Sequence, residues 1–105
     1  MAALFKLLYD NGADVVIGGH NHIYERFLPL AADGTPDAAR GIREFGVGTG
    51  GASLSGFRSN SANLVVRDNT TRGVLRLDLS AGGYTWQFLP VHTGGFSDAG
   101  TANCH

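Results

Sequence analysis

The feature that most limits how this chain can fold is the alternation of apolar and polar side chains in its C-terminal half. The alternation covers residues 64–67, 73–79 and 84–91, and the turn sequence Ser-Ala-Gly-Gly separates the last two segments. Because successive side chains of a strand point to opposite faces, this pattern predicts strands with one buried face. Tyr84, Trp86 and Phe88 share one parity and are the predicted buried side chains. The three segments therefore predict an antiparallel meander.

The N-terminal part of the chain has a different pattern. Apolar residues recur at three- and four-residue spacing before Asn11-Gly12, so residues 2–11 are predicted to form an amphipathic helix that ends at this pair. The next apolar run, Val15-Val16-Ile17, does not alternate, which is typical of a strand buried on both faces of a parallel sheet. Such a strand needs neighbouring strands, and none precede it. We therefore expect residues 1–105 to be the C-terminal part of a domain whose upstream half is absent.

Three further segments complete the predicted fold. Residues 24–30 and 42–48 are predicted strands, and the small, polar, glycine-rich residues 93–105 are predicted to be a loosely ordered tail. A chain of 105 residues with 43% hydrophobic content is at most one globular domain. The predicted fold class is α/β in the broad sense, more closely α+β, with one N-terminal helix followed by a mostly antiparallel β meander.

Composition and charge exclude several function classes. The formal charge is -1 and the basic residues are scattered, so we expect no nucleic-acid partner. No apolar run approaches the roughly 20 residues of a membrane span, and the N-terminus lacks the pattern of a signal peptide. The single cysteine, Cys104, excludes a disulfide within the monomer and a CxxC site.

The candidate metal ligands are His20 and His22 in the stretch Gly-Gly-His-Asn-His after the apolar run. In an extended backbone, residues i and i+2 face the same way, so both imidazoles can reach one metal ion or two adjacent ions. Ligands of open α/β sheets bind at the carboxyl ends of strands, which is where this pair is predicted to lie. Imidazoles suit zinc, iron, manganese or nickel. The alternative is that one or both are ordinary surface-loop histidines.

Three residues directly after the histidines are secondary candidates. Glu25 and Arg26 can orient a ligand histidine or contact a substrate phosphate, or they can form a solvated ion pair. Tyr24 can line the pocket, although an aromatic residue in a strand is more often part of the core. The glycines of residues 46–57 match GxGxxG, but no helical pattern follows, so a tight loop beside the candidate metal site is the favoured interpretation.

The stretch GGHNHIYER resembles GHxH, the last metal-binding motif of the calcineurin-like metallophosphoesterases, and its Tyr-Glu-Arg continuation is similar to the purple acid phosphatase branch and its bacterial relatives. The resemblance continues through RGIREFGVGTGGASL, GVLRLDL and YTWQFLPV to the final CH. It implies the C-terminal half of a β-sandwich flanked by helices, in a secreted protein that is extracellular or periplasmic. It also implies that His20 and His22 each bind one ion of a two-metal centre of zinc, iron or manganese that hydrolyses a phosphoester.

The other motifs of that family, DxH, GDxx(D/Y) and GNH(E/D), lie upstream of GHxH and do not occur in this sequence. We therefore expect the 105-residue chain alone to be inactive, and an exposed strand edge to cause self-association. The alternative hypothesis is a non-catalytic, β-rich metal-binding or interaction module.

Overall fold

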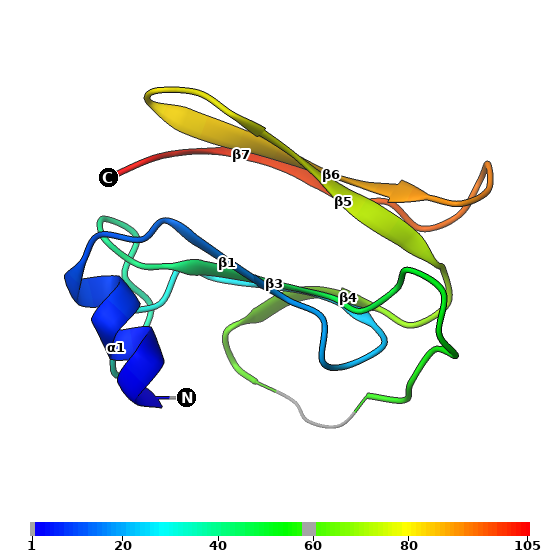
Figure 1. Ribbon diagram of the computed structural model, residues 1–105, viewed down its shortest axis with the longest axis horizontal. Helices are drawn as coiled ribbons and strands as arrows, with labels where there is room; N and C mark the ends of the chain where they lie inside the picture. The colour runs from blue at the N-terminus through cyan, green and yellow to red at the C-terminus, as the bar shows by residue number, and fades with distance from the viewer. Residues whose placement is uncertain (1, 58–60) are drawn as a thin grey trace.

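The part of the chain that the structure describes has one helix and two mostly antiparallel sheets, which makes it an α+β structure (Figure 1). The computed structural model describes residues 2–57 and 61–105. Within these ranges the elements are α1 (Ala2–Asp10), β1 (Val15–Gly18), β2 (Tyr24–Phe27), β3 (Arg43–Val47), β4 (Leu64–Asp68), β5 (Gly73–Leu79), β6 (Gly83–Pro90) and β7 (Ala99–Asn103). No helix in these ranges has the length and apolar character needed to cross a membrane.

The predicted N-terminal helix is confirmed, and its end has a clear local cause. Gly12 has φ 78°, a left-handed conformation that glycine adopts without a steric penalty. The amide of Gly12 donates to the carbonyl of Tyr9 at 3.1 Å, and that of Ala13 donates to Leu8 at 3.0 Å. These two bonds form a Schellman motif, which satisfies carbonyls that the last turn would otherwise leave unpaired.

The first sheet has four strands in the order β1-β3-β2-β4. β1 pairs with β3 in parallel, whereas β2 pairs antiparallel with both β3 and β4. Within the described residues β1 is an edge strand and the side chain of Ile17 is 52% exposed, so its burial by strands from an upstream half stays a prediction. α1 lies on the face of this sheet that points away from the other sheet (Figure 1).

The second sheet is an antiparallel meander of β5, β6 and β7. The sequence predicts a meander of residues 64–67, 73–79 and 84–91, and its first member is wrong, since β4 pairs with β2 in the other sheet. The chain changes sheets in the turn after β4, where the carboxylate of Asp68 accepts hydrogen bonds from the amides of Thr70 and Thr71 at 2.9 and 3.1 Å. After this turn the chain enters β5, which pairs with β6.

Residues 99–103 of the predicted loosely ordered tail form β7 on the edge of β6. Two contacts hold the segment before β7. The amide of Phe88 donates to the carbonyl of Asp98 at 2.7 Å, and the carboxylate of Asp98 pairs with Arg26. Small side chains suit this strand because Gly100 lies directly against the ring of Trp86.

The core lies between the two sheets, which face each other (Figure 1). The prediction that Tyr84, Trp86 and Phe88 share a buried face is confirmed, with exposed fractions of 5% or less. Tyr24 and Phe45 of the four-stranded sheet complete this cluster, in which the rings of Tyr24 and Phe88 are 4.9 Å apart. Burial of these aromatic side chains joins the two layers.

Candidate metal site

The histidine segment connects β1 to β2, so His20 follows the carboxyl end of β1 as the sequence predicts. The backbone of residues 20–23 bends and is not extended as the sequence predicts. The rule that residues i and i+2 share a face therefore does not apply to His20 and His22. Their common role as metal ligands stays a prediction.

The ring of His22 is oriented by the glycine-rich loop. Its Nδ1 lies 3.0 Å from the carbonyl oxygen of Ser53. Because a carbonyl only accepts hydrogen bonds, Nδ1 carries the proton in this contact, and in the neutral ring Nε2 then carries the lone pair. A histidine that binds a metal ion usually donates its other ring N–H to an oxygen acceptor in this way. The tautomer that this contact selects is the one that leaves Nε2 available to a metal ion.

The backbones of the two segments are joined as well. The amide of Ser55 donates to the carbonyl of His22 at 3.0 Å, and the amide of His22 donates to the hydroxyl of Ser55 at 3.3 Å. A Cβ on Gly48 would lie 2.0 Å from the carbonyl oxygen of Asn21, so only glycine fits this close approach. The predicted position of the glycine-rich loop, beside the histidine segment, is confirmed.

His20 lines a cavity of about 300 Å³ together with Glu25 and Glu44. Burial raises the pKa of Glu25, and the nearby Glu44 raises it further, while Arg67 opposes both effects. An imidazole and carboxylates are donors that zinc, iron and manganese accept. However, no group of three or more His, Cys, Asp or Glu side chains within the described ranges is placed to hold a metal ion. The described residues therefore do not by themselves complete a two-metal site.

Tyr24 and Arg26 do not face the histidines and point into the core instead. Tyr24 is fully buried, and its hydroxyl donates to the carboxylate of Asp98 at 2.6 Å. Arg26 binds the same carboxylate through Nε at 2.8 Å. Both side chains are thus engaged by Asp98, which favours the interpretation of Tyr24 as a core residue, and a substrate or ligand-orienting role for the pair stays a prediction. Glu25 lies between them on β2 and faces the opposite side, so it does not form the alternative ion pair with Arg26.

Burial and the contact with Asp98 both raise the pKa of Tyr24, so its hydroxyl remains a hydrogen-bond donor. Burial also acts to raise the pKa of Asp98, but the hydrogen bonds from Arg26 and Tyr24 outweigh it and hold this pKa below its usual value. Asp98 thus stays ionised and paired. The three side chains form a structural tie between the sheets.

Sequence reasoning missed four residues that shape this region: Ser53, Ser55, Glu44 and Asp98. Ser53 and Ser55 are more than 30 residues from His22, and Asp98 is 72 residues from Arg26. No local pattern predicts contacts over such separations. The one available signal was the glycine-rich composition of residues 46–57, which indicated a close backbone approach without indicating its partner.

Comparison of the chain with protein-family models, with curated proteins and with solved structures finds no match.

Proposed function

We propose that this chain supplies part of the metal centre of a metal-dependent phosphoesterase, with His20 and His22 as ligands. The remaining ligands would come from residues outside these 105. The observation that carries the proposal is the 3.0 Å contact between Nδ1 of His22 and the carbonyl of Ser53, which selects the ligand tautomer. The resemblance to the GHxH motif supports metal-dependent hydrolysis of a phosphoester as the reaction. His20 also follows the carboxyl end of β1, which is where the ligands of open α/β sheets bind.

Two bound zinc, iron or manganese ions would supply a hydroxide nucleophile and neutralise charge on a phosphoryl group. The role proposed for this chain is to position the two histidine ligands. Its glycine-rich loop holds the His22 ring in one orientation, and its bend after β1 presents His20 to a cavity that Glu25 and Glu44 also line. The proposed substrate is a small phosphate monoester. The proposed location is outside the cytoplasm, as the family resemblance implies.

Zinc binding tests the ligand assignment on the chain itself. Titration calorimetry should show weak Zn²⁺ binding to the unaltered chain, and either His20→Ala or His22→Ala should weaken it by about tenfold or more. His92→Ala is the matched control, because His92 is exposed and belongs to a different loop. Equal zinc affinity in the His22→Ala variant and the unaltered chain would contradict the assignment.

Catalysis requires a second experiment, in which the chain is extended by the residues encoded upstream of Met1. The extended protein should hydrolyse p-nitrophenyl phosphate in a metal-dependent manner, and either histidine substitution should lower turnover by orders of magnitude. The 105-residue chain should show no hydrolysis above its His20→Ala/His22→Ala double variant. Metal-dependent activity of the short chain that the double variant lacks would overturn the proposal of an incomplete site. Metal binding without activity in the extended protein would favour the non-catalytic module.

A further inference from the structure

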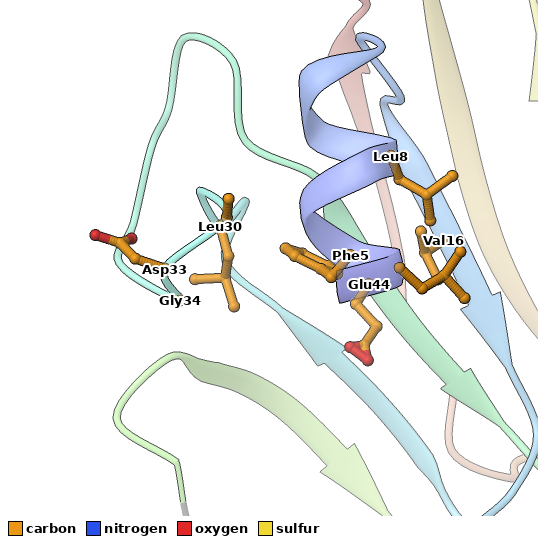
Figure 2. Close-up of a pocket in the computed structure, with 9 residues that line it drawn as sticks. Phe5, Leu8, Val16, Leu30, Asp33, Gly34 and Glu44 are labelled. Carbon is orange, nitrogen blue, oxygen red and sulfur yellow. The ribbon is translucent and has the colours of Figure 1, made fainter. Parts of the chain in front are cut away.

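A second cavity, separate from the candidate metal ligands, lies between α1 and the four-stranded sheet. Its volume is about 420 Å³, which is in the range of small-molecule sites. Figure 2 shows Phe5 and Leu8 projecting from α1, with Leu8 beside Val16 and Leu30 on the loop across from the helix. These side chains give the cavity mainly apolar walls. A ligand that fills it would need an apolar body.

The charged groups of this cavity have one sign. Glu44 and Asp33 line it, and none of its nine lining residues is basic. Figure 2 places the Glu44 carboxylate below the ring of Phe5. Within residues 2–57 and 61–105, no Lys, Arg or His nitrogen forms a salt bridge with Glu44. A half-buried carboxylate without such a partner favours a positive ligand.

Asp33 is exposed on the loop, and Figure 2 shows its carboxylate pointing away from Phe5 and Glu44. The hydroxyl and amide of Thr35 donate to its carboxylate at 2.6 and 3.0 Å, and these bonds lower the pKa of Asp33. Its ionised form is therefore the relevant one at neutral pH. An anionic ligand would meet repulsion from Glu44, and an inorganic cation would gain nothing from the apolar walls.

We infer that this cavity binds an organic cation with an apolar body, such as an aryl- or alkylammonium compound. The apolar body packs between α1 and the residue 30–34 loop, and the ammonium group lies at the carboxylate of Glu44. Burial of apolar surface supplies affinity, and the charge of Glu44 supplies selectivity for a cation over a neutral molecule of the same shape. Glu44 lines this cavity and the one beside His20, but the proposed phosphoesterase function assigns only His20 and His22 as ligands, and neither lines this cavity, so the inference does not depend on that function.

The test compares two probes of equal shape on the unaltered chain. Benzyltrimethylammonium carries the charge, and neopentylbenzene replaces its nitrogen with carbon. Amide NMR shifts on titration should locate both probes at Phe5, Val16 and Leu30, and the cation should bind about tenfold more tightly than its neutral isostere. Glu44→Gln should remove most of this preference. Glu25→Gln is the matched control and should retain it, because Glu25 lines the neighbouring cavity only.

Equal affinity of the unaltered chain for the two probes would by itself overturn the inference. Shifts confined to residues away from α1, or a preference for the cation that persists in Glu44→Gln and disappears in Glu25→Gln, would also overturn it. Loss of the preference at high salt in the unaltered chain would support the electrostatic origin.

Discussion

At the scale of single residues, Asp98 has the largest predicted effect on stability. It receives hydrogen bonds from Tyr24 and Arg26, and the side chains of Arg26 and Asp98 are only 13% and 10% exposed. Removing one partner of a buried pair leaves the other charge uncompensated, so Asp98→Asn should lower the free energy of unfolding by about 3 kcal/mol. Urea denaturation at pH 7 measures this. Asp78→Asn, which breaks an exposed ion pair with Arg76, should cost less than about 1 kcal/mol.

The same carboxylate predicts a pH dependence. Hydrogen bonds hold the pKa of Asp98 in the folded protein below its usual value despite burial, and the unfolded value is about 3.9. The stabilisation by Asp98 is therefore present above about pH 4 and is lost as the pH falls through the lower, folded value. Denaturation curves between pH 7 and pH 2 should show a steeper loss of stability in the unaltered chain than in Asp98→Asn. Parallel curves for the two proteins would contradict the assignment.

Gly48 is the residue on which the geometry of the histidine segment depends most directly. A Cβ at this position would meet the carbonyl oxygens of Asn21 and Gly19 at 2.0 and 2.7 Å, so Gly48→Ala forces the loop away from the histidine segment. We expect a loss of about 1–3 kcal/mol in stability. We also expect weaker zinc binding, because the carbonyl of Ser53 moves with the loop. Gly50→Ala is the control, since nothing lies within 4 Å of the position that its Cβ would take. Calorimetry and thermal unfolding that cannot distinguish the two variants would contradict this role.

At the scale of elements, the sequence predicted what short-range patterns determine. The spacing of apolar residues and the Asn11-Gly12 pair located α1 and its end, and alternation located β6 and its buried face. Strand partners were not predictable in the same way. β4 alternates much as β5 does, yet it pairs with β2 across more than 35 residues of chain. Pairing over such distances depends on how whole layers pack, and no local pattern encodes it.

The same difference between local patterns and long-range contacts applies to the candidate site. The order of strand, glycines and histidines placed His20 at the end of β1 correctly, because that order is local. The bend at residues 20–23, the carbonyl of Ser53 and the inward direction of Tyr24 and Arg26 all depend on segments distant in sequence. Sequence reasoning therefore identified the candidate ligands and missed the groups that orient or surround them.

β7 gives an element-scale test of the difference between a strand and a loose tail. Its residues pair with β6 from Gly83↔Asn103 to Gln87↔Ala99. Amides in a paired strand exchange with solvent only after local opening, so the peptide covering 99–103 should exchange far more slowly than residues 50–53 of the exposed loop. Hydrogen-exchange mass spectrometry provides the comparison. Equal exchange of the two segments would show that the C-terminal segment is loosely ordered after all.

At the scale of the whole molecule, one side of the sandwich is open. β1 and β5 are edge strands of the two sheets, and Ile17 and Leu79 line a cavity of about 450 Å³ between them. These two side chains are 52% and 75% exposed. The sequence of β1, Val-Val-Ile-Gly, contains no charge or proline, which are the residues that usually protect an edge strand from pairing with another chain.

The open side predicts that the chain self-associates. Unpaired backbone groups along β1 and exposed apolar side chains beside them favour pairing with a second copy, so sedimentation velocity should show oligomers that increase with protein concentration. Ile17→Lys places a charge at this edge and should shift the distribution toward monomer. Val91→Lys is the matched control, because Val91 is 70% exposed and lies just after β6, outside the open edge. A monodisperse monomer with a sharp cooperative melt would contradict the prediction, and an equal response to the two lysine substitutions would place the association at a surface other than β1.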